Sequence, residues 1–201
     1  SFAALDVDMM TLSAHKLGGP QGVGALIVRD GVDVACLLRG GGQERGRRAG
    51  TENVAGIAGF GAAVSLLDTV IAGAPALKEL RDGIENRMRA AVPDAVFYGV
   101  EAPRLPNTSC TGLPGVSNEV QVMALDLAGV AVSAGAACSS GKLTSSHVLQ
   151  AMGVSDEAAA SAIRVSLGWQ TNVADCERFV EVWTALANRR MRSDLGERSV
   201  A

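Results

Sequence analysis

The stretch VDMMTLSAHKLGGPQGVGALIVR, residues 7–29, decides the fold and introduces the first candidate site residue. Residues 7–14 and 23–29 are apolar and each predicts a β-strand. The Gly-Gly-Pro run at residues 18–20 is typical of a tight turn between them. Lys16 therefore ends a strand beside a glycine turn. Because ligands of open α/β sheets gather at the carboxyl ends of strands, Lys16 is a candidate site residue if the fold is of the α/β class, which the composition of the chain suits.

Lys16 is one of only three lysines among 18 basic residues, the others being Lys78 and Lys142. A lysine that loses solvation has a lowered pKa and can form a Schiff base with an aldehyde. Lys78 falls on the polar side of a predicted helix, and Lys142 lies in a run of small residues. Position alone favours the simpler interpretation, in which Lys16 only ends the strand.

Composition excludes several classes of protein. The chain has 201 residues, 48% hydrophobic and 3% aromatic, with a net charge of −3. Few aromatic side chains and a negative charge argue against binding nucleic acid. No apolar run reaches the ~20 residues of a membrane span, and the first residues do not form a signal peptide, so we expect a cytoplasmic protein without membrane contact. Four scattered cysteines without a C-x-x-C pair predict neither a metal site nor a disulfide framework.

The order of predicted elements indicates two domains, 1–72 and 73–201. The first comprises strand, strand, glycine-rich loop and helix, and is predicted to end a larger domain with a mostly parallel sheet. The second is predicted to be a small α+β domain, and the run Gly-Ala-Pro at 73–75 marks the boundary. Its expected helices cover residues 77–91, 120–127 and 173–191. Its expected strands cover residues 95–98, 107–111 and 163–167. The abrupt start in an apolar stretch predicts an incomplete protein.

Cys138 is the candidate nucleophile. It lies in residues 133–141, where no side chain is large enough to anchor the segment and glycines and serines favour flexibility. A mobile thiolate suits a nucleophile that takes up a group in one place and presents it in another. An incidental loop thiol fits the residues equally well. Cys36, Cys110 and Cys176 fall within strand or helix patterns and are interpreted as packing residues.

Two further segments carry chemistry of their own. Arg164 is predicted to face away from the apolar side of the strand at 163–167, where its guanidinium could bind a carboxylate. An exposed strand arginine remains the commoner case. Residues 40–53 are rich in glycine and arginine and contain Thr51, so they could bind a phosphate through backbone N–H groups. Their spacing does not match a Walker motif.

Taken together, these segments resemble one family. SAHK at 13–16 with GGPQGVG at 18–24 is similar to the cofactor-lysine segment of class-V aminotransferases. The segment GGGQERGRRAGT at 40–51 is similar to a hallmark of their cysteine desulfurase branch. SAGAACS at 133–139, with SHVL and AMG after it, resembles the catalytic-cysteine loop, and IRVSLG at 163–168 resembles the substrate-arginine strand. The segments follow the family's order over almost the whole chain.

The resemblance implies a role for each residue. Lys16 would hold pyridoxal 5'-phosphate and move the Cα proton, and Ser13 and His15 would bind its phosphate. Thr51 would reach the phosphate of a neighbouring subunit, which implies a homodimer. Arg164 would bind the carboxylate of L-cysteine. Cys138 would take its sulfur as a persulfide for an acceptor such as an iron–sulfur scaffold protein, leaving L-alanine.

The chain also departs from the family. The aspartate, glutamine and histidine that contact the cofactor ring in the family precede the lysine by more than the 15 residues present here, so we expect that this polypeptide alone does not catalyse. The alternatives are a selenocysteine lyase, another class-V enzyme, or a non-catalytic fragment that acts as an interaction module. Replacement of Cys138 by alanine distinguishes a cysteine desulfurase from a selenocysteine lyase. The desulfurase would lose cysteine turnover, whereas the lyase could retain turnover of selenocysteine.

Overall fold

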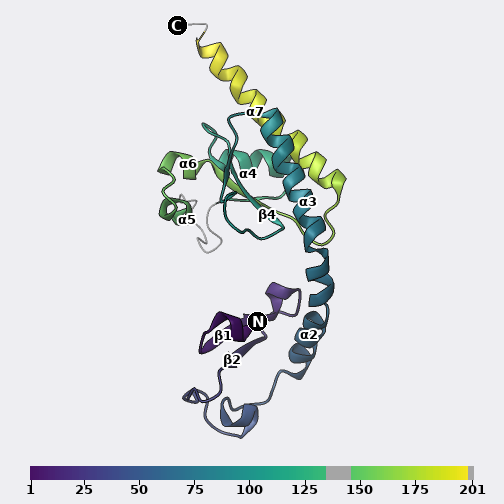
Figure 1. Cartoon of the computed structure of the whole chain (residues 1–201), viewed down its shortest axis with the longest axis vertical. Helices are drawn as coiled ribbons and strands as arrows, with labels where there is room; N and C mark the ends of the chain where they lie inside the picture. The colour runs from purple at the N-terminus through teal and green to yellow at the C-terminus, as the bar shows by residue number, and fades with distance from the viewer. Residues whose placement is uncertain (135–145, 199–201) are drawn as a thin grey trace. The chain divides into compact units, whose positions relative to one another are not determined.

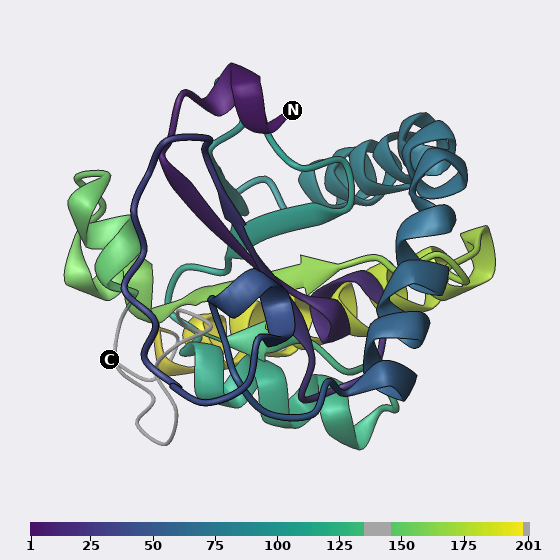
Figure 2. The same cartoon turned by 90° about the horizontal axis from the view of Figure 1, so that it is seen from below.

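The computed structural model describes residues 1–134 and 146–198, with side chains up to residue 190. The chain divides into two compact units, Ser1–Ile71 and Ala72–Ala201 (Figures 1 and 2). The assignment of 1–72 and 73–201 to the domains of a larger enzyme stays a prediction. Each unit is described by itself below.

An antiparallel hairpin forms the centre of the first unit. After helix α1 (Phe2–Leu5), strands β1 (Met9–Ser13) and β2 (Gly24–Val28) pair from Met9↔Val28 to Ser13↔Gly24. Both predicted strands are confirmed. They are joined by the short helix η1 (Ala14–Leu17), which ends at Gly18 with a φ of +83° that favours glycine. Figure 1 shows the hairpin in purple.

The first unit continues through the glycine-rich loop, with the short helix η2 (Gln43–Gly46), into helix α2 (Val54–Ser65). Asn53 begins α2, because its side chain accepts a hydrogen bond from the Gly56 N–H at 3.1 Å. A Cβ on Gly59 would lie 2.5 Å from Pro20 Cγ. This glycine therefore allows α2 to pack closely against the turn that follows Lys16.

Helix α3 (Leu67–Ala91) corrects one expectation from the sequence. The Gly-Ala-Pro run at 73–75 predicts the end of one helix and the start of another, but Pro75 lies inside α3. The break between helices falls instead at Leu66, whose N–H donates to the carbonyls of Ala63 and Val64. Pro75 lacks an N–H, so the Ile71 carbonyl loses its helical partner, a local loss that the turns on either side tolerate. Among the described residues no single helix is long and apolar enough to span a membrane, although α2 and α3 meet those criteria together as a bent pair.

The second unit contains a four-stranded sheet in the order β3-β4-β6-β5. Its strands are β3 (Val96–Tyr98), β4 (Thr108–Gly112), β6 (Ala162–Ser166) and β5 (Ser133–Ala134). Three of these strands were predicted and are confirmed, whereas the two-residue β5 was missed. Every pair in both described sheets is antiparallel, so the mostly parallel sheet expected for the large domain is not represented in these residues.

Helices cover both faces of this sheet. On one face, α3, α4 (Asn118–Leu127) and α7 (Val173–Arg198) pack with Ile163 and Val165 around the fully buried Trp183. On the other face, α5 (His147–Ala151) and α6 (Asp156–Ala160) place Leu149 and Ala159 against Ala162. The two sides differ because successive residues of β6 point to opposite faces.

Buried polar groups are paired within this core. The Gln121 amide, fully buried, donates to the Val116 carbonyl at 3.0 Å and the Ser161 carbonyl at 2.6 Å. Its oxygen accepts the Trp183 indole N–H at 3.1 Å. These bonds connect α4, α7 and the segment before β6, and a partner lost here would leave a buried polar atom unsatisfied.

Candidate active site

Arg164 lies in the middle of the second unit's sheet. On β6 it is directly opposite Cys110 of β4 and Ser133 of β5, and Cys110 is in turn opposite Tyr98 of β3. Directly opposed residues share a face of an antiparallel sheet, so these four side chains form one row across it. The row lies on the face covered by α5 and α6, since Tyr98 and Cys110 pack against the cluster of Leu149, Ala159 and Ala162.

Two side chains of this row, Cys110 and Tyr98, carry no charge beside Arg164. Burial raises the pKa of the Cys110 thiol, although the positive charge of Arg164 acts in the opposite direction. Burial likewise raises the pKa of Tyr98, whose hydroxyl donates to the Ala158 carbonyl at 3.2 Å. Both groups are therefore neutral at pH 7 and supply no counter-charge to the guanidinium.

Arg164 itself is half-buried and has no hydrogen bond or ion pair to any other described residue. The two other half-buried or buried arginines near this sheet, Arg81 and Arg104, both contact carboxylates. Charged groups withdrawn from water are normally paired. Within the described residues no carboxylate pairs with Arg164, so its guanidinium can bind a carboxylate ligand through two parallel hydrogen bonds.

Lys16 occupies a well-defined turn in the first unit. Ala14 beside it is fully buried, its N–H donates to Val23 at 3.1 Å, and its carbonyl accepts from Gly19 at 2.9 Å. A Cβ at Gly24 would lie 2.4 Å from the Leu12 carbonyl oxygen, so only glycine fits opposite the end of β1. His15 and Lys16 are exposed and Ser13 is half-buried, which leaves an amine, an imidazole and a hydroxyl accessible on one short segment.

The glycine-rich loop is folded on itself. Arg48 donates to the carbonyl of Gly50 at 3.2 Å, and the Gln43 side chain accepts the Gly50 N–H at 3.3 Å. Gly50 has a φ of +99°, and Ala49 is buried beneath the loop. These contacts fix the backbone that leads to Thr51, which is exposed and free to meet a ligand.

The predicted site residues thus fall into three groups. Ser13, His15 and Lys16 are adjacent in the first unit, and Thr51 belongs to the same unit. Arg164 belongs to the second unit, and its predicted orientation away from the apolar face is confirmed. Cys138 lies outside the described residues.

Sequence reasoning missed Tyr98 as a neighbour of the site and assigned Cys110 to packing alone. Cys110 does pack against the smaller core cluster, so that part of the prediction is confirmed. Its position opposite Arg164 depends on strand register, which no local pattern reveals. Among the described residues, no three His, Cys, Asp or Glu side chains form a group that could hold a metal ion.

The α/β fold, the strand-end lysine and a strand arginine without a partner among the described residues fit a protein of the aminotransferase type. The chain belongs to the class-V aminotransferase family, which it matches over residues 1–179. Within that family it is similar to the cysteine desulfurase of Cereibacter sphaeroides, at 47% identity over 196 residues, and to that of Klebsiella pneumoniae, at 41% over 183 residues. These matches cover 97% and 91% of this chain but 50% and 46% of the relatives, so the chain spans about half their length.

Solved structures agree with this assignment. A NifS-like protein from Rickettsia africae superposes on 94% of this chain with a TM-score of 0.81 and 35% identity. A second NifS-like protein does so over 94% with a TM-score of 0.79 and 32% identity. Those superpositions use 49% and 48% of the two solved chains. The expected α/β fold and the resemblance to cysteine desulfurases are both confirmed.

Proposed function

We propose that this chain is part of a pyridoxal-phosphate-dependent cysteine desulfurase that converts L-cysteine to L-alanine and passes the sulfur onward. The observation that carries the proposal is Arg164, a half-buried arginine in the row with Cys110 and Tyr98 that forms no ion pair with another described residue. An α-amino acid substrate supplies the carboxylate that such an arginine requires. The similarity to cysteine desulfurases at 40–47% identity supports L-cysteine as that amino acid.

The residues around Lys16 fit the cofactor. The Lys16 amine can bind an aldehyde covalently, and Ser13 and His15 on the same segment can donate hydrogen bonds to a phosphate. Thr51 fits the phosphate of a second subunit, which makes a homodimer part of the proposal. When bound, pyridoxal phosphate supplies an electron sink for reaction at Cα. Lys16 accepts and returns the Cα proton.

Cys138 is the proposed sulfur acceptor. Its thiolate attacks the substrate sulfur, an S–S bond forms as the C–S bond breaks, and the electron pair remains with the carbon fragment. That fragment takes up a proton and leaves as L-alanine, while Cys138 retains a persulfide. The persulfide sulfur is then available to an acceptor protein, for which an iron–sulfur scaffold is our proposal.

The test begins with the cofactor. The chain is incubated with pyridoxal phosphate, its visible spectrum is recorded before and after borohydride, and the labelled lysine is located by mass spectrometry. We expect one stable adduct on Lys16 and none in Lys16→Ala. Lys142→Ala, at a lysine with no proposed role in cofactor binding, is the control and is expected to leave the adduct unchanged. Equal labelling of all lysines would contradict the assignment of Lys16.

The second arm tests the nucleophile in the catalytically complete protein. Cys138→Ser is expected to abolish release of sulfide and alanine from L-cysteine, and Cys110→Ser to retain it. Cysteine turnover that survives Cys138→Ser would contradict the proposed role of Cys138. Turnover of selenocysteine alone would identify the enzyme as a selenocysteine lyase.

A further inference from the structure

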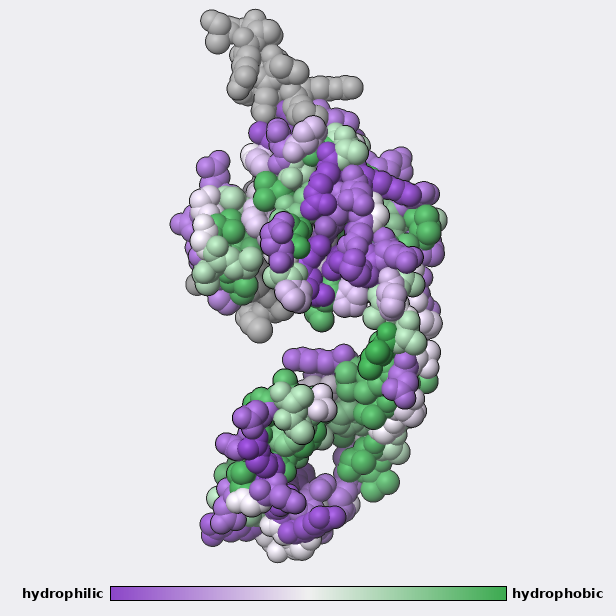
Figure 3. Space-filling view, viewed as in Figure 1, coloured by the Kyte–Doolittle hydropathy of each residue, from purple (hydrophilic) through white to green (hydrophobic). Residues whose placement is uncertain are grey.

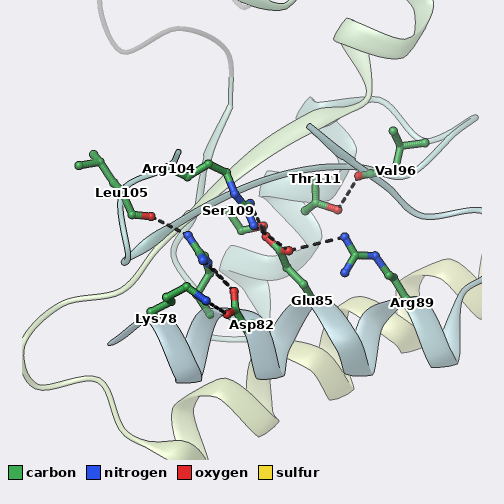
Figure 4. A network of polar contacts seen from close by, with 10 residues as sticks. Lys78, Asp82, Glu85, Arg89, Val96, Arg104, Leu105, Ser109 and Thr111 are labelled. Atoms are coloured by element: carbon green, nitrogen blue, oxygen red, sulfur yellow. Dashed lines mark hydrogen bonds and ion pairs between the residues drawn. The ribbon is translucent and has the colours of Figure 1, made fainter. Parts of the chain in front are cut away.

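A second cluster of charged residues lies away from the row of Arg164, on helix α3 (Figure 4). At its centre is Glu85, which is only 2% exposed. Its carboxylate accepts hydrogen bonds from both terminal nitrogens of Arg104, at 2.7 and 3.2 Å, and from the Ser109 hydroxyl at 2.7 Å. Arg89 lies 3.6 Å from the same carboxylate. Glu85 is thus shared between two arginines.

Asp82, one turn earlier, is shared in the same way. Arg81 contacts it at 2.7 Å and also donates to the Leu105 carbonyl at 2.7 Å, and Lys78 forms a further ion pair with it. Each carboxylate therefore has two cationic neighbours. The cluster of Lys78, Arg81, Asp82, Glu85, Arg89 and Arg104 has two positive charges in excess.

These residues line one hollow of about 540 Å³ between α3 and the loop before β4. Figure 3 shows hydrophilic side chains gathered over α3 in the second unit. The opposite wall of the hollow is apolar, with Val100, Ala102 and Pro103. Seven of the ten residues that line the hollow are charged or polar, so it favours a small charged ligand over an apolar one.

Two cations in the hollow have donors to spare. Arg89 is 44% exposed and Lys78 is 60% exposed. The Arg89 guanidinium lies over the Phe97 ring, 4.2 Å from its centroid, and forms no hydrogen bond to another described residue. The ring fixes one face of the guanidinium and leaves its N–H edges available to an acceptor.

We propose that this hollow binds a small phosphate monoester. Its phosphate, close to doubly negative at neutral pH, matches the two excess positive charges and accepts hydrogen bonds from Arg89, Arg104 and Lys78. Its organic part contacts the apolar wall of Val100 and Pro103. This site shares no residue with the row of Arg164 or with the residues proposed to hold the cofactor, and it assigns the chain a second ligand.

The test uses phenyl phosphate, inorganic phosphate and phenol as probes, titrated into the full 201-residue chain at low ionic strength. Side-chain ¹⁵N NMR of the arginines reports binding at the hollow itself. We expect saturable shifts of Arg89 and Arg104 with phenyl phosphate, at least tenfold weaker affinity for inorganic phosphate, and no shift with phenol.

Arg89→Gln and Lys78→Gln are each expected to weaken the binding of phenyl phosphate at least tenfold. The matched control is Arg87→Gln, on the same helix, 50% exposed and ion-paired to Glu177 outside the hollow, and it is expected to change the affinity less than twofold. The proposal is overturned if the Arg104 signal does not shift in the unmodified chain, if Arg89→Gln leaves the affinity unchanged, or if Arg87→Gln weakens it equally.

Discussion

Cys110 and Arg164 lie directly opposite each other on β4 and β6, and the charge of the arginine acts on the half-buried thiol. The thiol is a titratable neighbour of Arg164 across the strand pair, and its raised pKa keeps it neutral at pH 7. A neutral neighbour leaves the guanidinium free for the carboxylate of a substrate. The position opposite Arg164 therefore requires a small, uncharged side chain more than it requires a thiol.

Cys110→Asp tests that relationship. A carboxylate opposite Arg164 would form an ion pair and compete with the substrate, so we expect KM for L-cysteine to rise about 100-fold, equivalent to about 2–3 kcal/mol. Steady-state kinetics of the catalytically complete protein provide the measurement. Cys110→Asn, of similar size and uncharged, is the control and is expected to change KM less than threefold. Equal KM values for the two variants would contradict the prediction.

Gly24→Ala is expected to disturb the turn that holds Lys16. The added Cβ would lie 2.4 Å from the Leu12 carbonyl oxygen, a clash with backbone that β1 and β2 must separate to relieve. Overpacking of this kind costs about 1–3 kcal/mol. The yield of borohydride-reduced cofactor adduct on Lys16, measured by mass spectrometry, should fall. Gly42→Ala, where a Cβ meets open space, should leave the yield unchanged.

Trp183→Phe removes the one donor that the described residues supply to the Gln121 side-chain oxygen, and it leaves space in the core. We expect the free energy of unfolding, measured in urea, to fall by about 3 kcal/mol from the unsatisfied oxygen and the cavity together. The other tryptophan is a matched control, because Trp169 is 84% exposed and Trp169→Phe should change stability by less than about 0.5 kcal/mol. Equal losses of unfolding free energy in Trp183→Phe and Trp169→Phe would show that the buried Trp183–Gln121 hydrogen bond is not the cause of the destabilisation.

Ser109→Ala should alter the pH dependence of stability. Burial raises the pKa of Glu85, but hydrogen bonds from Arg104 and Ser109 and nearby positive charges outweigh it, so the pKa lies below the ordinary value of 4.5. Glu85 therefore contributes stability above about pH 4.5, and this contribution is lost as the pH falls through the folded-state pKa.

Without the Ser109 hydroxyl, the unfolding free energy at pH 7 should fall by about 1–2 kcal/mol, and the difference should shrink in acid as Glu85 is protonated. Urea unfolding at pH 7 and pH 3 provides the comparison. Ser166→Ala, at an exposed position of β6 in the same sheet, should give a small difference that does not change with pH. A pH-independent loss in Ser109→Ala would contradict the role of Glu85.

Local patterns were sufficient for the parts of the fold that depend on neighbours in sequence. Alternating side chains predicted β6 and the orientation of Arg164, and glycine placement predicted the turn after Lys16. Pro75 was misleading, because a helix tolerates one lost hydrogen bond when the turns on either side are intact. The row of Tyr98 and Cys110 beside Arg164 could not be predicted, since it depends on the register of strands that are distant in sequence.

The same limit applies to the cluster on α3. Glu85 and Arg89 are spaced as an ordinary surface pair of a helix, and only the approach of Arg104 and Ser109 from other segments buries the carboxylate. Strand β5 was missed for a simpler reason. Two residues are too few to show an alternating pattern.

The division of the chain at Ile71 has an optical consequence. Both tryptophans and the single tyrosine, Tyr98, lie in the second unit, so the tryptophan and tyrosine fluorescence of this protein reports on that unit alone. Trp183 in the core and Trp169 in solvent should emit at different wavelengths, which separates core loosening from surface events. The first unit is silent at these wavelengths, and the absorbance of a chromophore bound at Lys16 would be its natural reporter.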